Sequence, residues 1–372
     1  MPRAAIPDDI PALLAIETRC FSSDRLSRRS FRHLLTRGNA ITLVEEDAGQ
    51  IRGYVLVLFS RGASMARLYS IAVHPDFARR KIGDRLLEAA EAAALEQDCV
   101  SMRLEVRRDN PPSLNLFRRH GYRQFKEVLD YYEDHMTALR FEKRLVPQLR
   151  IDLVKVPYYQ QTLDFTCGPA ALMMAMKALD PALDLDRKLE LRLWREATTI
   201  FMTAGHGGCG PYGLALSAHR RGFDLEIHVN EDGVFLVDSV RNPEKKEVMR
   251  LVQEDWIEEL RQLPVVLRCG SLGVDELRRK FDAGGIPLVL ISSYRIYGER
   301  FPHWVVVTGF DDHYIYVHDP FVDVETDETV TDSVNMPISH REFQRMARYG
   351  KVAQKAVLIL YRSNRHSESP AP

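Results

Sequence analysis

The sequence has few of the features that would place a protein in a membrane or outside the cell. No stretch approaches the ~18 consecutive apolar residues of a membrane-spanning helix, although 45% of the residues are hydrophobic. The first residues show no apolar core and no cleavage signature, so we expect no signal peptide. The cysteines are odd in number and widely spaced (20, 99, 167, 209 and 269), which favours reduced thiols over disulfides. We therefore expect a cytoplasmic protein without a membrane partner.

An excess of charge of either sign is also absent. The chain has 51 basic and 52 acidic residues and a formal net charge of -1. Nothing in this balance favours nucleic acid as a partner. The sequence shows no internal repeat and no low-complexity tract. At 372 residues, the chain is long enough for two domains of roughly 150 residues each.

The first part of the chain, residues 1–145, alternates predicted strands and helices and reads as an α/β domain. A helix is expected over 9–20, a second over 82–97 and a short third over 113–120. Strands are expected over 40–45, 51–59, 65–73, 101–106 and 130–140.

The second part, residues 150–362, has a different order. Helices come first, after Cys167, over 186–195 and over 212–220, and short strands follow. The strands are expected over 225–229, 264–268, 287–292, 304–310 and 314–319. Helices followed by strands suggest an α+β domain. The last residues, 363–372, are polar, and we expect a disordered tail.

A strand, a loop and a helix over 69–87 form the first chemical motif. His74-Pro75 ends the strand, and the basic run Arg79-Arg80-Lys81 precedes the helix. Gly83 in its first turn permits a close approach of the backbone. The backbone N–H groups and the dipole at such a helix start suit a pyrophosphate.

This stretch resembles the GNAT acetyltransferase family, especially the ribosomal-protein alanine acetyltransferases. The resemblance covers about residues 1–143 and includes the segment from Leu104 to Tyr122. It implies a mixed-sheet domain that binds acetyl-CoA and acetylates an amine, such as a peptide or protein N-terminus. It also implies that Glu105 is the general base. The cofactor-binding residues that it implies are Val73, Arg79, Arg80, Lys81, Ile82, Gly83 and Asn110.

The sequence departs from the family pattern at three positions. Ala78 and Lys81 stand where the family has glutamine or arginine and glycine, so only the last residue of the loop motif, Gly83, is retained. Phe117 stands where the family has a tyrosine that returns a proton to the thiolate. A tyrosine at 122, 131 or 132, or water, could replace it. Alternatively, this half is a degenerate acetyl-CoA-binding sensor.

A thiol at the start of an apolar helix forms the second motif. Cys167-Gly168-Pro169 precedes Ala170–Leu179, with proline in the first helical turn. A helix start and a histidine partner both stabilise a thiolate. Gln161 lies six positions upstream, and its amide can donate to an oxyanion together with the Cys167 backbone N–H.

A predicted hairpin supplies the other two groups. His303 opens the strand 304–310, and Asp319 ends the strand 314–319. A turn at 311–313 pairs the two strands, so the start of one lies near the end of the other. Asp319 can then orient the imidazole of His303.

These residues resemble the C39 peptidases and their C39-like relatives, which have a papain-like fold. The resemblance covers about residues 150–360, and it implies a cysteine peptidase in which Cys167, His303, Asp319 and Gln161 are catalytic. Peptide transfer instead of hydrolysis remains an alternative. His206 and Cys209 lack a second ligand pair with zinc-like spacing, so no metal is expected.

Overall fold

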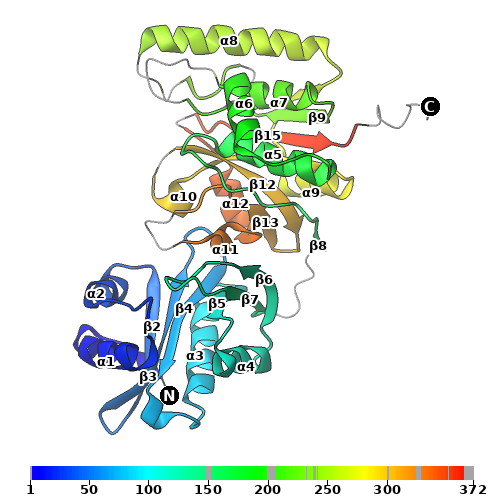
Figure 1. Cartoon of the computed structure of the whole chain (residues 1–372). Helices are drawn as coiled ribbons and strands as arrows, with labels where there is room; N and C mark the ends of the chain where they lie inside the picture. Colours follow the sequence, from blue (N-terminus) through cyan, green and yellow to red (C-terminus); the bar gives the residue numbers. More distant parts are fainter. Residues whose placement is uncertain are drawn as a thin grey trace, which may run out of the picture. The chain divides into compact units, whose positions relative to one another are not determined.

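The computed structural model describes residues 2–146, 152–198, 207–231, 233–237, 240, 242–299, 301–323, 328–350 and 352–363. The predicted tail, apart from Ser363, lies outside these residues, and so does His206. The chain divides into two compact units, Met1–Leu149 and Arg150–Pro372 (Figure 1). No helix of the described residues is long and apolar enough to cross a membrane.

The first unit is a sheet of seven strands in the order β1-β2-β3-β4-β5-β7-β6. Only β4 and β5 are parallel neighbours. Helices cover both faces, α1 and α2 on one and α3 and α4 on the other (Figure 1). The elements are β1 (Arg3–Ala4), η1 (Pro7–Asp9), α1 (Ile10–Cys20), α2 (Arg28–Thr36), β2 (Ala40–Asp47), β3 (Gln50–Phe59), β4 (Met65–Val73), η2 (Pro75–Phe77), α3 (Ile82–Glu96), β5 (Ser101–Arg107), α4 (Pro111–Arg119), β6 (Arg123–Val128) and β7 (Ala138–Arg144).

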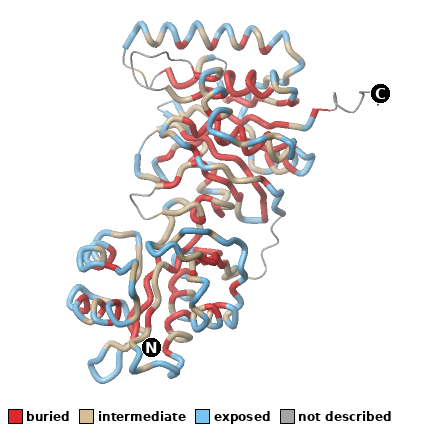
Figure 2. Tube along the Cα trace, in the orientation of Figure 1, coloured by how far each residue is buried: buried red, intermediate tan, exposed pale blue. Residues whose placement is uncertain are grey.

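Alternation along β3 builds the two cores of this unit, because successive side chains point to opposite faces. Tyr54 and Leu56 pack with α1 and α2, whereas Val55 and Val57 pack with α3. Figure 2 shows the central strands and the inner sides of the helices as buried. One prediction is wrong here. Residues 130–137 form a turn, and the strand expected over 130–140 begins only at Ala138.

The second unit is a sheet in the order β10-β9-β15-β11-β12-β13-β14, with β8 paired to β12. Its elements are β8 (Asp152–Leu153), α5 (Cys167–Leu179), α6 (Arg187–Ala197), α7 (Pro211–His219), β9 (Asp224–Val229), α8 (Pro243–Gln262), β10 (Val266–Cys269), α9 (Val274–Asp282), β11 (Ile286–Ser292), α10 (Tyr294–Tyr297), β12 (Pro302–Phe310), β13 (Tyr314–His318), α11 (Val330–Ser333), β14 (Met336–Ser339), α12 (His340–Met346) and β15 (Ala356–Tyr361). The prediction of an α/β domain followed by an α+β domain is confirmed.

Helix α5 lies at the centre of this unit and packs on β11, β12 and β15. Every residue from Cys167 to Met176 is buried. A helix that is apolar all round is a core helix, as expected for the apolar helix predicted after Cys167. The start of α5 is consequently fixed by packing on all sides.

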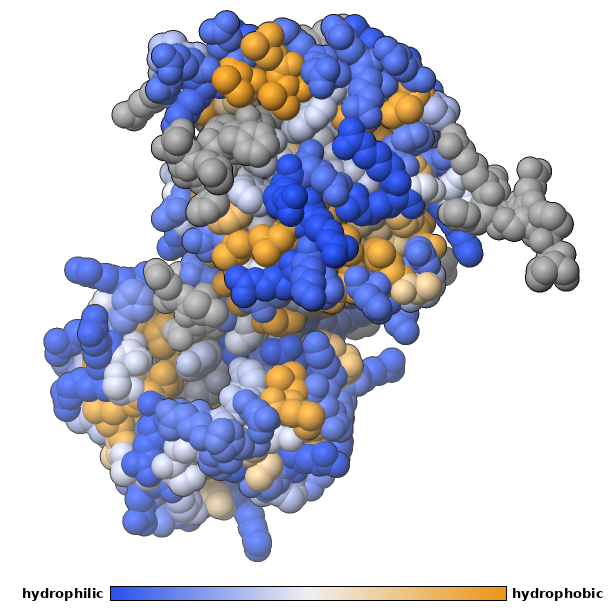
Figure 3. All heavy atoms as spheres, turned by 45° about the horizontal axis from the view of Figure 1, so that its top comes forward, coloured by the Kyte–Doolittle hydropathy of each residue, from blue (hydrophilic) through white to orange (hydrophobic). Residues whose placement is uncertain are grey.

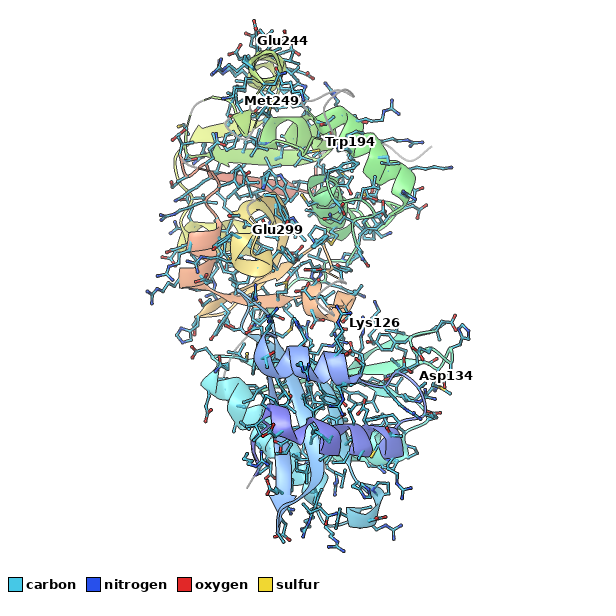
Figure 4. All side chains as sticks on the ribbon, turned by 90° about the vertical axis from the view of Figure 1, so that its left-hand side faces the viewer. Lys126, Asp134, Trp194, Glu244, Met249 and Glu299 are labelled. Carbon is cyan, nitrogen blue, oxygen red and sulfur yellow. The ribbon has the colours of Figure 1, made fainter. Side chains whose placement is uncertain are left out.

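Helix α8 forms the outer layer of the second unit. It packs on α7 through Met249, while Glu244 points away from that contact (Figure 4). Val248 and Leu251 of α8 are exposed. Figure 3 shows the hydrophobic side chains of the visible face in small groups between hydrophilic ones.

Candidate active sites

The thiol of the second unit lies at the first residue of α5. Cys167 is 6% exposed, and Thr166 precedes the helix without capping it through its side chain. Gly168 follows at a position where a larger residue would be crowded. A Cβ at this position would lie 3.1–3.3 Å from atoms of Leu214, Trp304 and Cys209.

The predicted hairpin is present, and it brings His303 to Asp319. Val306 of β12 pairs with His318 of β13, and Asp319 follows directly. Nε2 of His303 lies 2.6 Å from Oδ1 of Asp319. The thiol of Cys167 lies close enough to the imidazole to contribute to its raised pKa. Since Nε2 faces the carboxylate, Nδ1 is the ring nitrogen left for the thiol.

The charge state of His303 follows from these contacts. Burial alone lowers its pKa, but the charge and hydrogen bond of Asp319, together with Cys167, raise the pKa of His303 to about 10. The imidazole is therefore positively charged at neutral pH. A cation at this position stabilises a neighbouring thiolate.

Sequence reasoning did not identify the residues that hold Asp319. Its Oδ1 also accepts from the backbone N–H of Phe321 at 2.9 Å, and its Oδ2 accepts from the hydroxyl of Tyr297 at 2.8 Å. The Tyr297 ring stands edge-on to His303. No local signal marks Tyr297, because its role depends on the packing of α10 beside the hairpin.

A backbone hydrogen bond connects Gln161 to the segment that follows Asp319 of this triad. Its N–H donates to the carbonyl of Pro320 at 2.8 Å, so the loop before Cys167 is tied to the segment after Asp319. Its side-chain Nε2 donates to the carbonyl of Leu163 at 2.9 Å. One amide hydrogen remains for another acceptor. The buried Oε1 has no partner among the described residues.

The first unit carries the second candidate site, at the end of β4. This strand pairs with β5 only from Met65↔Ser101 to Leu68↔Leu104. Residues 70–73 continue along β3, and on their other edge no strand pairs with them in the described part of the sheet. Val73 ends this segment, and its carbonyl accepts from the thiol of Cys20 at 3.3 Å.

The loop after β4 leads to the start of α3. Arg79, Arg80 and Lys81 are all exposed, and Lys81 precedes the helix without a side-chain cap. Arg79 and Lys81 have positive φ, 62° and 56°. The open N–H groups and three cations fit the pyrophosphate of acetyl-CoA. Arg79, Arg80, Lys81, Ile82 and Gly83 would hold it.

Glu105 lies on β5 just beyond the end of the β4–β5 pairing. Its carboxylate is buried and approaches Arg67 at 3.0 Å and Arg140 at 3.3 Å. Both of its oxygens therefore face guanidinium groups. The hydroxyl of Tyr131 accepts from the same Arg67 at 3.1 Å.

The other tyrosines considered as replacements for Phe117 make different contacts. The hydroxyl of Tyr122 donates to the sulfur of Met102 at 3.2 Å, and burial raises its pKa. The Tyr132 ring lies under Arg107, 5.1 Å from its guanidinium carbon. Of the three, Tyr131 is thus the one that shares a cation with Glu105.

Asn110 caps α4. Its Oδ1 accepts from the backbone N–H of Ser113 at 3.2 Å, which leaves its amide nitrogen outside the cap. The structure therefore gives Asn110 a local role in addition to the predicted cofactor contact.

Comparison with known proteins assigns each unit to a family. Residues 156–361 match the model of the Peptidase_C39 like family, and residues 10–122 match the Acetyltransferase (GNAT) family. The GNAT family uses acetyl-CoA.

Individual relatives match the first unit. An N-alpha-acetyltransferase of Sulfurisphaera tokodaii is 28% identical over 147 residues, 37% of this chain and 78% of the relative. The catalytic subunit of the N-terminal acetyltransferase A complex of Arabidopsis thaliana is 28% identical over 149 residues, 38% of this chain and 77% of the relative. A solved structure of the ribosomal-protein-S18-alanine N-acetyltransferase of Escherichia coli is 21% identical, with a TM-score of 0.36, and covers 40% of this chain and 98% of its own.

Proposed function

Since the chain belongs to the Peptidase_C39 like family and begins with a GNAT acetyltransferase domain, we propose that it is an enzyme with two active sites. The first, within residues 1–145, transfers an acetyl group to an amine, such as a peptide or protein N-terminus. The second, within residues 150–362, cleaves a peptide or amide bond through Cys167. Both reactions concern peptide-like groups, so one class of peptide or protein substrate serves both.

The observation that supports the peptidase most strongly is the contact of His303 with both Asp319 and Cys167. The sulfur of Cys167 attacks the carbonyl carbon and forms a thioester, the C–N bond breaks, and His303 gives its proton to the leaving amine. His303 then takes a proton from water, which hydrolyses the thioester. The Cys167 backbone N–H and the Gln161 amide stabilise the oxyanion, and Asp319 orients the imidazole.

The observation that supports acetyl transfer is the uncapped start of α3 beside three exposed cations. Bound acetyl-CoA supplies an acetyl thioester. The chain's own residues bind its pyrophosphate at 79–83, and the backbone of Val73 at the open edge of β4 binds its pantetheine arm. Glu105 remains the predicted acceptor of the amine proton, and Tyr131 is the tyrosine we assign to the proton-donating role that Phe117 lacks.

A peptide library examined by mass spectrometry tests both activities. We expect acetylated N-termini when acetyl-CoA is present, and cleavage products with or without it. Cys167→Ala should abolish cleavage and leave acetylation unchanged. Products that carry an added acceptor amine instead of water would indicate peptide transfer. Peptides that stay unchanged under all conditions would contradict the proposal.

A sensor is the second candidate for the first unit, because Ala78, Lys81 and Phe117 depart from the family pattern. Calorimetry with acetyl-CoA separates the two cases. Arg79→Glu with Arg80→Glu should weaken binding about 10-fold or more, because charge-assisted phosphate contacts are lost. The matched control Arg37→Glu, an exposed arginine at the end of α2, should not. Tight binding without acetylation of any amine would favour the sensor.

A further inference from the structure

A buried carboxylate in the second unit takes no part in the mechanism above. Glu190 on α6 is 0% exposed, although charged side chains are rarely buried unless they are paired. Among the described residues, no basic side chain forms a salt bridge with it. Its hydrogen-bond partners are all neutral.

All of these partners belong to the segment that leads to Cys167. Oε2 accepts from the hydroxyls of Tyr159 at 2.9 Å and of Thr162 at 2.7 Å. Oε1 accepts from the backbone N–H of Thr162 at 2.8 Å and from the hydroxyl of Thr166. Hydrogen bonds to an ionised acceptor are roughly twice as strong as neutral ones. One carboxylate thus fixes both ends of the loop 162–166. These ends are Thr162, which follows Gln161, and Thr166, which precedes Cys167.

The contact with Thr166 has a second effect. A threonine before a helix usually turns its oxygen toward the N–H groups of the first turn. Here the Thr166 hydroxyl shares its one hydrogen between Glu190 and the carbonyl of Leu163, and no side chain caps α5. The third helical residue, Pro169, has no N–H. The N–H groups of Cys167 and Gly168 are therefore left open at the helix start, where an oxyanion would form.

We infer that Glu190 is a positioning residue of the thiol site: it holds Gln161 in place and keeps the start of α5 open for the oxyanion. This inference rests on the proposed peptidase function. Glu190 does not touch the reacting atoms itself. It acts through Thr162 and Thr166.

Glu190→Gln tests this role because glutamine keeps the size and removes the charge. The probe is a peptide aldehyde, which adds to a thiolate and leaves an oxyanion in the position that Gln161 and α5 serve. We expect Glu190→Gln to bind the aldehyde more weakly than wild type, by a factor of up to about 10. The kcat for a cleaved peptide should fall in parallel, and KM should change little. Iodoacetamide alkylates Cys167 without forming an oxyanion. The rate of this alkylation should therefore change by a smaller factor than the aldehyde affinity.

Glu196→Gln on the same helix is the matched control, since Glu196 pairs with Arg221 and makes no hydrogen bond with the loop in the described part of the chain. It should leave aldehyde binding unchanged. If Glu190→Gln fails to fold, Thr162→Val is the second test. It removes one of the four hydrogen bonds to Glu190 and should also weaken aldehyde binding. Equal aldehyde affinity in the wild-type protein and the folded variant would overturn the inference.

Failure of the peptidase proposal gives a different result. If the wild-type protein binds no aldehyde and cleaves no peptide, that proposal fails. The role of Glu190 is then decided by hydrogen exchange of residues 159–166. Faster exchange in Glu190→Gln supports the role in holding this loop, and unchanged exchange refutes it.

Discussion

Single buried side chains determine how the second unit responds to pH. His303 is positively charged because Asp319 outweighs the effect of burial on its pKa. Tyr297 stays neutral, since burial and the Asp319 carboxylate both raise its pKa. Glu328 is an acid with a raised pKa. Burial and the negative charges of nearby aspartates raise the pKa of Glu328 to about 8.

The charged imidazole beside Cys167 predicts a reactive thiol. At neutral pH, iodoacetamide should alkylate Cys167 faster in the wild-type protein than in His303→Ala. Labelled-peptide mass spectrometry can follow Cys167 separately from the other thiols. His313→Ala, a histidine in the β12–β13 turn, is the control and should behave like wild type. Equal alkylation rates in wild type and His303→Ala would contradict the proposed role of the imidazolium.

Glu328 predicts a loss of stability as the pH rises from 4.5 to about 8. Its pKa in the folded protein, about 8, lies above the ordinary value of 4.5, so its contribution is fully present below pH 4.5 and is lost as the pH rises through 8. Glu328→Gln should therefore have a higher Tm than wild type at pH 8.5, and a smaller difference at pH 5. Thermal unfolding of both proteins across this range measures the effect. The exposed Glu299→Gln (Figure 4) should show no such trend, and parallel curves for Glu328→Gln would refute the prediction.

The sequence predicts the thiol and its partners better than it predicts their support. Cys167, His303, Asp319 and Gln161 carry local signals, namely a helix start, two strand ends and an upstream amide. Glu190 carries none, because in the sequence it is one more polar position of an amphipathic helix. Its importance follows from where α6 packs, which depends on contacts across the whole core.

At the scale of elements, many regular patterns were predicted, although the helices α2, α8 and α9 were missed. The pairing of strands that are distant in the sequence was not predicted. The hairpin β12–β13 and the helices α3, α5 and α7 follow from strand and helix periodicity, and they are confirmed. Strand β15 was missed, although it pairs with β9 and β11 in the middle of its sheet. Its partners are more than sixty residues away in the sequence, so no local pattern reveals them.

The loop before α3 stores backbone strain at Lys81, which has φ 56°. A left-handed conformation costs a residue with a side chain about 1 kcal/mol relative to glycine. Lys81→Gly should therefore have a higher free energy of unfolding than Lys81→Ala by up to about 1 kcal/mol. Both variants lose the amine, so their difference isolates the backbone. Chemical denaturation measures it, and an alanine variant as stable as the glycine variant would contradict the strain.

At the scale of the whole molecule, each unit has a hydrophobic core of its own. We expect residues 1–146 and 152–372, expressed separately, to unfold cooperatively. The first piece should bind acetyl-CoA as tightly as the full chain, and the second should show the same rate of Cys167 alkylation. Calorimetry and alkylation kinetics measure the two properties. Loss of either property in an isolated, folded piece would show that the units depend on one another.

The early end of the β4–β5 ladder makes the first sheet incomplete. Beyond Leu68 and Leu104, no strand among the described residues pairs with residues 70–73 of β4 on the side of β5. A ligand that carries amides of its own would complete the hydrogen bonding there, in the manner of an added strand. Preparations of the amino-terminal unit should accordingly resist proteases and heat best when coenzyme A is kept in the buffer.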